Sequence, residues 1–251
     1  MKIEGITAVV TGAASGLGAA TTEALAAGGA RVLGIDLASQ VEKAQAREGV
    51  RYIAADVTSE DQVRAALDEV EESHPLRVVV NCAGIAPARR ILSSRGTHDL
   101  ETFRRTLEVN TLGTFNVMRL AAELIAQQEG DEHGQRGVII NTASVAAYEG
   151  QIGQIAYSAS KGAVVGMTIT AARDLARYGI RVNTIAPGIV DTPMLASLGP
   201  EVGASLAAGI PFPQRLAQPS EYAQLALMLV EHDYLNGEVV RMDGALRMPP
   251  Q

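Results

Sequence analysis

The chain has 251 residues, 47% of them hydrophobic and 20% charged, so it can fill a packed core and is not a disordered protein. Its 21 Lys and Arg residues are outnumbered by 28 Asp and Glu residues, and this excess of acid argues against nucleic acid or an anionic membrane as the main partner. The single cysteine, Cys82, excludes a disulfide within the chain and a zinc site built from cysteines, and no metal site is predicted.

Short runs rich in β-branched residues alternate with longer helical patterns along the chain. The expected strands are Ile6–Val10, Arg31–Asp36, Arg51–Ala55, Val78–Asn81, Val138–Thr142, Arg181–Ala186 and Glu238–Met242. The expected helices are Gly16–Ala27, Ser59–Glu72, Asp99–Gln128, Gly153–Arg177 and Pro219–Val230. Several strands are apolar on both faces, as in a parallel sheet covered by helices. This alternation predicts an α/β fold with a doubly wound parallel sheet, in one domain over residues 1–251.

Two stretches break the alternation. Ile85–His98 contains three arginines, and Gly188–Gln218 contains four prolines and several glycines. Both follow an expected strand, and ligands of doubly wound sheets bind beyond the carboxyl ends of the strands. Both stretches are therefore expected to border the ligand crevice, the second as a substrate lid at about 188–218.

The chain starts with Met1-Lys2-Ile3-Glu4-Gly5, where a signal peptide would have an apolar run. The longest apolar runs are interrupted well before about 18 residues, so no membrane span is predicted. We expect a cytoplasmic protein.

A glycine-rich turn follows the first expected strand. It reads Thr11-Gly12-Ala13-Ala14-Ser15-Gly16-Leu17-Gly18 and leads directly into a helix. Glycines permit a tight turn, and the free N–H groups at the start of the helix can bind a diphosphate. Such a turn is also compatible with an ordinary strand-to-helix connection, but its position at the first strand favours a nucleotide site.

Small and acidic residues end the next three strands. Asp36 lies about 20 residues beyond the glycines, where a carboxylate accepts both ribose hydroxyls of NAD and repels a 2′-phosphate. We favour this role over a helix cap or loop acid. Asp56, before Val57, could bond the adenine amino group or cap the next helix, and the two interpretations stay open. Cys82-Ala83-Gly84 would let the backbone pass close to a cofactor, with Cys82 as a small packed residue rather than a nucleophile.

Tyr157 and Lys161 are four residues apart in a helical pattern, so both side chains project from one face. A neighbouring ammonium lowers the pKa of a tyrosine, and such a phenol can exchange a proton with an alcohol or carbonyl. Ser144 follows a strand and could donate to the substrate oxygen. Asn110 lies within an expected helix, where it could interrupt the hydrogen-bond ladder and hold a water molecule. Alone, the Tyr/Lys pair and the Asn are also typical of helix surfaces.

Together these residues form a signature that spans nearly the whole chain. Its motifs are Thr11-Gly12-x-x-x-Gly16-x-Gly18, Asn81-x-Ala83-Gly84, Asn110, Ser144, Tyr157-x-x-x-Lys161 and Pro187-Gly188. The chain resembles the short-chain dehydrogenase/reductase family. The resemblance implies a Rossmann-type sheet of seven strands in the order 3-2-1-4-5-6-7, with helices on both faces.

The resemblance also implies a catalytic tetrad. Tyr157 would be the general acid and base, and Ser144 would orient and polarise the substrate oxygen. Lys161 would lower the pKa of Tyr157 and bind the nicotinamide ribose, and Asn110 would hold a relay water. One departure is Cys82, where many members of the family have a second Asn.

For the cofactor, the resemblance implies NAD. The segment Pro187–Thr192 would meet the nicotinamide carboxamide through backbone groups and the Thr192 hydroxyl. The expected cofactor residues are Gly12, Ser15, Gly16, Leu17, Gly18, Asp36, Asp56, Val57, Cys82, Ala83, Gly84, Tyr157, Lys161, Pro187, Val190 and Thr192.

A narrower resemblance is to the subfamily of type 2 3-hydroxyacyl-CoA dehydrogenases, also called type 10 17β-hydroxysteroid dehydrogenases. The segments that carry it are Gly137–Gln151, Pro211–Pro213, Leu235–Val239 and Met242–Ala245. The resemblance implies an NAD-dependent homotetramer of fatty acid metabolism that interconverts 3-hydroxyacyl-CoA and 3-oxoacyl-CoA. Ser144, Tyr157, Gln151 and Gln154 would then face the substrate.

Three arginines, Arg89, Arg90 and Arg95, could contact CoA phosphates at the rim of the crevice, although we favour a solvated basic loop. Two other functions stay open within the fold: a dehydrogenase of another secondary alcohol such as a hydroxysteroid, and a 3-oxoacyl-carrier-protein reductase. Asp36 argues against the NADPH-dependent form of the latter. In a nucleotide-binding scaffold that has lost catalysis, we would expect residues of the tetrad to be replaced, whereas all four are present.

Overall fold

The computed structural model of the protein describes residues 1–196 and 199–250. In these residues, seven strands form one sheet in the order β3-β2-β1-β4-β7-β8-β9, and every neighbouring pair is parallel. The strands are β1 (Thr7–Thr11), β2 (Arg31–Asp36), β3 (Val50–Ala54), β4 (Leu76–Asn81), β7 (Gly137–Thr142), β8 (Ile180–Pro187) and β9 (Val239–Met242). The predicted doubly wound parallel sheet and its strand order are confirmed.

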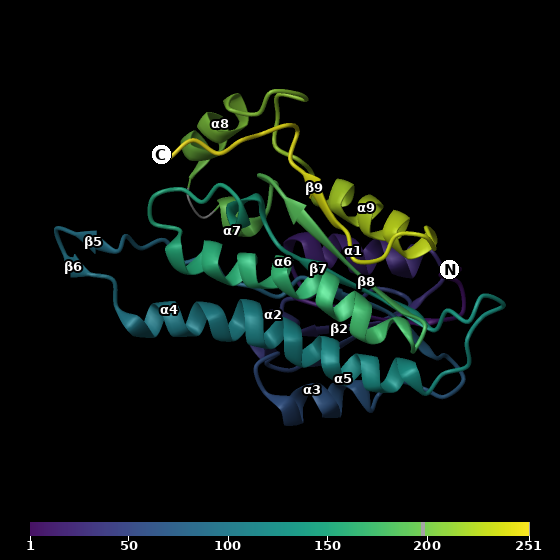
Figure 1. Cartoon of the computed structure of the whole chain (residues 1–251). Helices are drawn as coiled ribbons and strands as arrows, with labels where there is room; N and C mark the ends of the chain where they lie inside the picture. Colours follow the sequence, from purple (N-terminus) through teal and green to yellow (C-terminus); the bar gives the residue numbers. More distant parts are fainter. Residues whose placement is uncertain (197–198, 251) are drawn as a thin grey trace.

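Helices cover both faces of the sheet (Figure 1). On one face lie α1 (Gly16–Ala27) and α9 (Pro219–Glu231), and on the other lie α3 (Glu60–Leu67), α5 (Thr114–Ala126) and α6 (Ile155–Ala176). No helix among the described residues is long and apolar enough to cross a lipid bilayer.

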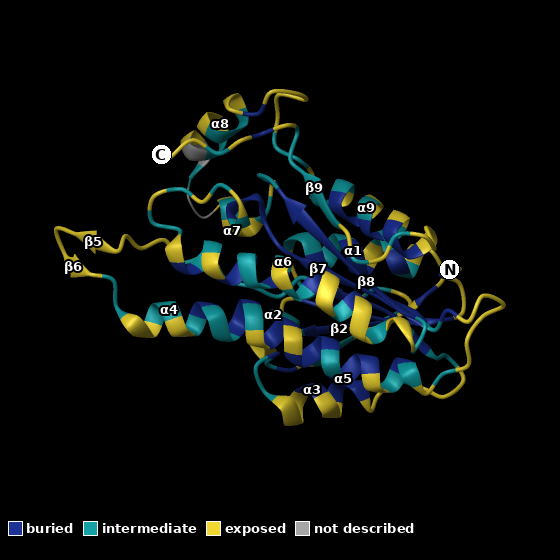
Figure 2. Cartoon of the chain, viewed as in Figure 1, coloured by how far each residue is buried: buried dark blue, intermediate teal, exposed yellow. Residues whose placement is uncertain are grey.

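Alternate residues of the central strands explain why these strands are apolar throughout. Val9, Val79 and Ile139 pack with α3, α5 and α6, whereas their successors in the chain pack with α1 and α9. All of these side chains are fully buried, and Figure 2 shows the sheet as a buried layer between helices. Burial on both faces requires β-branched residues at successive positions, which is the pattern the sequence displays.

Shorter elements complete the chain. They are α2 (Ala38–Val41), β5 (Leu92–Ser93), β6 (Gly96–Thr97), α4 (Leu100–Leu107), the π-helix η1 (Glu108–Gly113), the 3₁₀ helix η2 (Val145–Ala147), α7 (Pro193–Ala196) and α8 (Pro200–Ala208). The single helix predicted for Asp99–Gln128 is wrong, because η1 separates α4 from α5. The helix predicted for Ser59–Glu72 ends early, at Leu67, and Ser59 is its N-cap.

The sheet reverses its winding between β1 and β4, which lie side by side with Thr11 opposite Asn81. From β1 the chain proceeds outward through β2 and β3, and β4 lies on the other side of β1. The turns that follow β1 and β4 therefore diverge from neighbouring points. Such a switch point leaves a crevice at the carboxyl ends of the strands. The β5–β6 hairpin, α7 and α8 lie at this end of the molecule (Figure 1).

Candidate active site

The glycine-rich turn lies at the switch point and is as tight as its composition suggests. Gly12 has a φ of +65°, and a Cβ on it would lie 2.9 Å from the Ala83 nitrogen. A Cβ on Gly18 would lie 2.1 Å from the Gly12 oxygen. Side chains at both positions are therefore excluded by backbone atoms, and the turn stays narrow where it enters α1.

This turn fits the diphosphate of a dinucleotide. The Thr11 hydroxyl accepts hydrogen bonds from the backbone N–H groups of Cys82 and Ala83, both at 3.1 Å, which holds the two turns together. Ser15, at the N-cap of α1, has an extended backbone, and within the described part of the chain its side chain makes no capping hydrogen bond. The N–H groups of the first turn are thus left for an anion, which the positive end of the helix dipole also favours.

Asp36 ends β2 beside this turn. Its carboxylate accepts hydrogen bonds from the backbone N–H of Ala14 at 3.0 Å and of Leu37 at 2.8 Å. The Ala14 bond holds the carboxylate against the glycine-rich turn, where a ribose next to the diphosphate would lie. The position agrees with the predicted ribose contact, and the contact itself stays a prediction.

Asp56 is engaged with protein groups. One oxygen accepts hydrogen bonds from the N–H and hydroxyl of Thr58 at 2.9 and 2.7 Å, and the other accepts from Arg105 at 3.3 Å. Burial raises the pKa of Asp56, but these bonds outweigh it and hold the pKa below its usual value. The cap of α3 is Ser59, so the alternative of a helix cap by Asp56 is wrong. The adenine contact stays a prediction, as does that of Val57, which packs against Gly113 in η1.

Cys82 packs among polar groups beneath the crevice. Its Sγ lies 3.7 Å from both the Tyr222 hydroxyl and the Thr142 hydroxyl. Burial raises the pKa of the thiol, which keeps it protonated. This environment agrees with a packed residue and not with a nucleophile.

Ser144, Tyr157 and Lys161 come together at the carboxyl end of β7. Ser144 directly precedes η2, and its hydroxyl accepts a hydrogen bond from Ala146 N–H at 3.1 Å and hydrogen-bonds the Tyr157 hydroxyl. Tyr157 and Lys161 project from the first turns of α6. The Lys161 Nζ lies 5.9 Å from the centre of the Tyr157 ring and donates to the Thr142 carbonyl at 2.7 Å.

The predicted lowering of the Tyr157 pKa is wrong for the chain by itself. Burial raises the pKa of this phenol, and the hydrogen bond to Ser144 offsets only part of the increase. Lys161 is only 4% exposed, and burial lowers its own pKa to about 8. In the chain by itself the ammonium is bonded to the Thr142 carbonyl and does not lower the pKa of Tyr157, and its stabilisation of a tyrosinate stays a prediction.

Asn110 lies in η1 and is fully buried. Its Oδ1 accepts from Ile85 N–H at 2.8 Å, and its Nδ2 donates to the Ile85 carbonyl at 2.9 Å and to the Ser160 hydroxyl at 2.9 Å. The predicted interruption of the helical ladder is confirmed. The side chain ties the turn after β4 to α6, next to Lys161, and the relay water stays a prediction.

Gln151 and Gln154 close the turn that leads into α6. The Gln151 N–H donates to Gln154 Oε1 at 3.0 Å, and the Gln154 N–H donates to the Gln151 carbonyl at 3.0 Å. Gln154 therefore shapes the loop before Tyr157 through its side chain. Contact of either residue with substrate stays a prediction.

The segment after β8 reaches the glycine-rich turn. β8 ends at Pro187, and a Cβ on Gly16 would lie 3.5 Å from the Thr192 methyl group. Val190 pairs with Ala217, so the two ends of the predicted lid meet at one place. The lid includes residues 197–198, which lie outside the described residues.

The three arginines of the first irregular stretch differ in their surroundings. Arg89 forms an ion pair with Asp99 at 2.9 Å, and its N–H donates to the Gly153 carbonyl at 2.7 Å. Arg90 and Arg95 are exposed, Arg95 in the β5–β6 hairpin that projects beside the crevice (Figure 1).

Sequence reasoning missed two hydroxyl groups behind the site. The Thr142 hydroxyl donates to the Asn81 carbonyl at 2.6 Å and shares a hydrogen bond of 2.7 Å with Tyr222. Tyr222 comes from α9, on the other face of the sheet, and is fully buried. The hydrogen bond from Tyr222 holds Thr142 in place, and the Thr142 carbonyl in turn accepts the hydrogen bond from Lys161. The bond between Thr142 and Tyr222 joins residues 80 positions apart, so no local pattern could reveal it.

Known proteins resemble this chain in sequence and in fold over nearly its whole length. The profile of the short chain dehydrogenase family matches residues 6–203. The chain is 53% identical to human 3-hydroxyacyl-CoA dehydrogenase type-2 over 99% of its length and 98% of the human protein. It is 53% identical to the Drosophila melanogaster protein of the same name, over 99% and 100% of the two chains. The crystal structure of 3-hydroxyacyl-CoA dehydrogenase type-2 from Mycobacterium avium superposes with a TM-score of 0.91 at 45% identity, covering 98% of each chain.

Proposed function

Since the chain belongs to the short-chain dehydrogenase family and is therefore an oxidoreductase with a small-molecule substrate and a nicotinamide cofactor, we propose that it interconverts 3-hydroxyacyl-CoA and 3-oxoacyl-CoA with NAD. The observation that carries this proposal is the hydrogen-bonded pair of Ser144 and Tyr157 beside Lys161. The similarity to the named 3-hydroxyacyl-CoA dehydrogenases supports the substrate class.

In the proposed reaction, each residue acts on one atom or charge. The Ser144 hydroxyl donates a hydrogen bond to the substrate oxygen at C3. In the direction of reduction the Tyr157 phenol gives its proton to that oxygen, and in oxidation the tyrosinate takes it back. The Lys161 ammonium stabilises the tyrosinate, and Asn110 holds the water that relays protons to Lys161. Bound NAD supplies the chemistry of hydride acceptance and donation.

The choice of NAD over NADP rests on Asp36. Its carboxylate lies against the glycine-rich turn and would repel a 2′-phosphate while accepting both ribose hydroxyls. The same charge argues against an NADPH-dependent 3-oxoacyl-carrier-protein reductase. The residues we propose to contact NAD are Gly12, Ser15, Gly16, Leu17, Gly18, Asp36, Asp56, Val57, Cys82, Ala83, Gly84, Tyr157, Lys161, Pro187, Val190 and Thr192.

The proposal is tested by initial rates of NADH oxidation with acetoacetyl-CoA and purified protein. We expect rapid turnover with NADH and at least about 10²-fold lower kcat/KM with NADPH, because an unpaired like charge at the ribose costs several kcal/mol. NADH binding without turnover of acetoacetyl-CoA would overturn the acyl-CoA assignment and favour another secondary alcohol, such as a hydroxysteroid. Turnover with NADPH alone would contradict the role of Asp36.

Removal of the three rim arginines tests whether CoA phosphates bind there. The triple replacement of Arg89, Arg90 and Arg95 by Ala is expected to raise KM for acetoacetyl-CoA about 3- to 150-fold, since exposed charge pairs contribute about 0.2–1 kcal/mol each. The KM for NADH should not change. Arg177→Ala is the matched control, because Arg177 stacks on Tyr178 at the far end of α6. Unchanged acyl-CoA kinetics would support a solvated basic loop instead.

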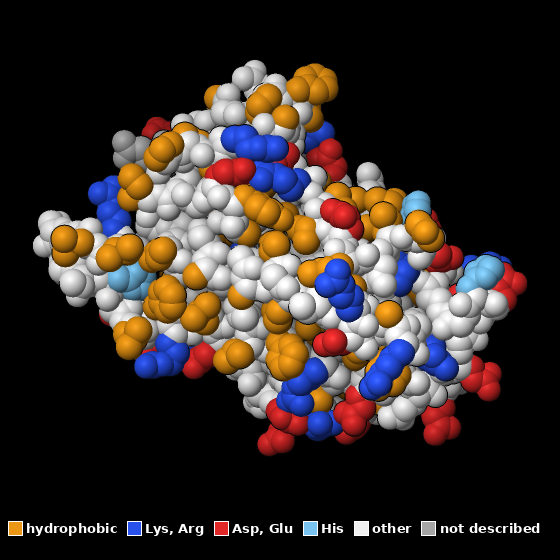
Figure 3. All heavy atoms as spheres, in the orientation of Figure 1, with side chains coloured by type: hydrophobic (Ala, Val, Ile, Leu, Met, Phe, Trp, Pro, Cys, Tyr) orange, Lys and Arg blue, Asp and Glu red, His pale blue; other side chains and the backbone are white. Residues whose placement is uncertain are grey.

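We further propose that residues 1–251 form one catalytic domain, that residues 188–218 cover the substrate, and that the enzyme is a cytoplasmic homotetramer. Apolar side chains gather on the face over α4, α5 and α6 (Figure 3), where Leu112 of η1, Phe115 of α5 and Ile169 of α6 are 44–58% exposed. Exposed apolar patches of this kind are typical of interfaces between subunits. Sedimentation velocity of the purified chain measures the assembly directly.

A further inference from the structure

The chain after β9 is irregular and runs from Asp243 to Pro250 across the crevice end of the sheet (Figure 1). It has no helix or strand of its own in the described residues, yet Leu246 within it is only 3% exposed. We call residues 243–250 the C-terminal segment. Its position therefore depends on what it contacts.

The C-terminal segment lies directly against the chain after β8. The Gly188 N–H donates to the Met242 carbonyl at 2.9 Å, and a Cβ on Gly188 would lie 2.9 Å from the Asp243 Cα. The backbones of the two segments are in contact here, so position 188 has no room for a side chain. The segment thus abuts the residues proposed to meet the nicotinamide.

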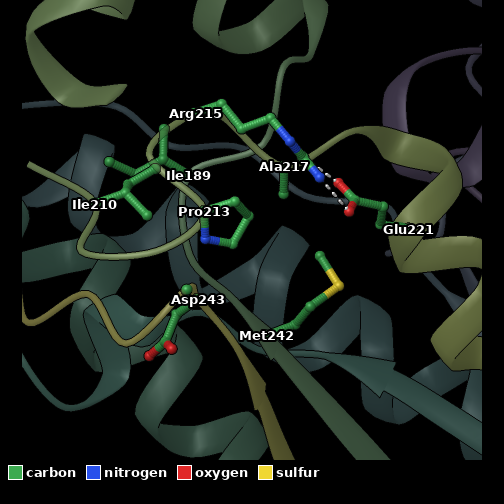
Figure 4. A pocket seen from close by; sticks show the side chains of 9 residues that line it. Ile189, Ile210, Pro213, Arg215, Ala217, Glu221, Met242 and Asp243 are labelled. Atoms are coloured by element: carbon green, nitrogen blue, oxygen red, sulfur yellow. Dashed lines mark hydrogen bonds and ion pairs between the residues drawn. The ribbon is translucent and has the colours of Figure 1, made fainter. Parts of the chain in front are cut away.

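The C-terminal segment also contacts the lid. The Phe212 N–H donates to the Gly244 carbonyl at 3.3 Å, and a Cβ on Gly244 would lie 2.7 Å from Ile210 Cγ2. Beside this contact is a cavity of about 170 Å³, lined by both segments. Met242 points toward this cavity and the Asp243 carboxylate points away from it (Figure 4). The contact with the lid is therefore only partly packed.

The third contact is with the loop between Ser144 and Tyr157. The Ile152 N–H donates to the Pro250 carbonyl at 2.9 Å. Tyr148 and Ile152 are about half exposed, at 48% and 50%, so little burial holds this loop in place. A loop with few buried contacts opens easily unless specific bonds restrain it.

Arg241, in β9, supplies those bonds. Its guanidinium donates to both carboxylate oxygens of Glu149 at 2.9 Å, and its Nε donates to Asp243 at 2.7 Å. It also lies 5.2 Å from the centre of the Tyr148 ring, and it donates to the Leu246 carbonyl at 3.1 Å. One side chain therefore binds both the 148–152 loop and the C-terminal segment.

The electrostatics of this cluster favour a fixed geometry. Hydrogen bonds from Arg241 hold the pKa of Glu149 below its usual value, so the carboxylate stays charged at neutral pH. Arg247 also forms an ion pair with Asp243 at 3.0 Å. The negative charges of the two carboxylates in the cluster are therefore balanced by the positive charges of two guanidinium groups. Arg241 and Glu149 are three-quarters buried, and a bidentate pair of arginine and carboxylate restricts orientation as well as distance.

We propose that Arg241 is a positioning residue, which locks the 148–152 loop to the C-terminal segment and so holds Gln151 and the approach to Tyr157 in place for the acyl chain. The inference rests on the proposed function for its substrate, although the locking itself does not. A displacement of about 1 Å near a reacting centre can cost about 10²-fold in rate. The loop that Arg241 holds lies directly between Ser144 and Tyr157 in the chain.

The test is Arg241→Gln, measured by kinetics and by hydrogen exchange. We expect kcat/KM for acetoacetyl-CoA to fall about 10- to 100-fold, mainly through KM. We expect the Kd for NADH, from fluorescence, to change less than about twofold, since the glycine-rich turn and Asp36 are untouched. Amide exchange should become faster in residues 148–154 and 243–250 and stay unchanged in the central strands.

A double-mutant cycle that combines Arg241→Gln with Glu149→Gln tests whether the two residues act together. If the two residues act together, the double variant should be no worse than either single variant, because residues of one network are not additive. Arg241→Lys should recover part of the activity. The matched control is Arg64→Gln, which breaks the ion pairs of Arg64 with Glu60 and Glu123 on the outside of α3 and α5.

Wild-type KM and wild-type exchange in Arg241→Gln would overturn the proposal. An equal loss of NADH affinity would also overturn it, because the effect would then extend to the cofactor site and would not be specific to the loop. If Arg241→Gln does not fold, Glu149→Gln carries the same two measurements. If the wild type does not turn over acetoacetyl-CoA, the proposed function fails, and hydrogen exchange still decides whether Arg241 locks the loop.

Discussion

Replacing Tyr157 by Phe is expected to lower kcat with acetoacetyl-CoA about 10²- to 10⁴-fold, the range found when a general acid or base is removed. The phenol hydroxyl hydrogen-bonds Ser144, and Phe removes this hydroxyl while it keeps the ring. Burial raises the pKa of Tyr157, so the phenol holds its proton at neutral pH and is ready to give it to a carbonyl oxygen. The measurement is the initial rate of NADH oxidation at pH 7 with saturating substrate.

The control for this variant is Tyr178→Phe. Tyr178 also carries a phenol bonded to a neighbour, in this case by Arg177 at 2.6 Å, but it lies beyond the other end of α6. This variant should keep wild-type kcat. NADH fluorescence and thermal unfolding of Tyr157→Phe should both match the wild type. A loss below about tenfold would show that another group transfers the proton.

Replacing Lys161 by Met is expected to abolish most turnover and to change how stability depends on pH. Burial lowers the pKa of Lys161 to about 8 from 10.5, so the unfolded chain binds this proton more tightly than the folded chain. Below pH 8 the folded state carries the full free-energy cost of the buried ammonium, which destabilises it relative to the unfolded state. This cost is lost as the pH rises from 8 to 10.5. The wild type should therefore gain about 2 kcal/mol relative to the variant between pH 7 and pH 9.5.

Urea unfolding at the two pH values measures this difference. Loss of the bond to the Thr142 carbonyl also destabilises the variant, but that loss is the same at both pH values and cancels. Lys43→Met is the matched control, since Lys43 is exposed in the loop after α2 and its variant should follow the wild type. Equal stability differences at pH 7 and pH 9.5 would show that Lys161 is not a destabilising buried charge.

The sheet was the most predictable part of the structure. Arg31–Asp36 and Gly16–Ala27 are a strand and a helix with the predicted bounds, because local composition and buried periodicity agree there. The β5–β6 hairpin was not predicted, since its residues are exposed and have no periodic pattern. The division of the helix at Asp99–Gln128 follows from the buried bonds of Asn110 to Ile85 and Ser160, which are contacts between distant parts of the chain.

The candidate site was predictable in its residues and not in its energetics. Ser144, Tyr157 and Lys161 meet as the family resemblance implies. The Tyr157 pKa was predicted in the wrong direction, because a spacing of four residues reveals a neighbouring charge but not the depth of burial. The support from Tyr222 and the anchoring by Arg241 depend on contacts over 80 and 92 positions, which the local sequence does not encode.

The π-helix at Glu108–Gly113 limits how this part of the chain can change in length. Consecutive residues of a helix are about 100° apart around its axis, and a π turn contains about one residue more than an α turn. The wide turn therefore takes up one extra residue locally, and the α-helices on either side keep their facing. Deletion of one residue here would restore α pairing and leave the buried face of α5 toward the sheet, whereas the residues of the turn itself would change direction and Asn110 would turn away from Ile85. A one-residue deletion at this helix centre would thus spare the packing of α5 and disrupt the site, whereas the exposed loop after α5 can change in length without either effect.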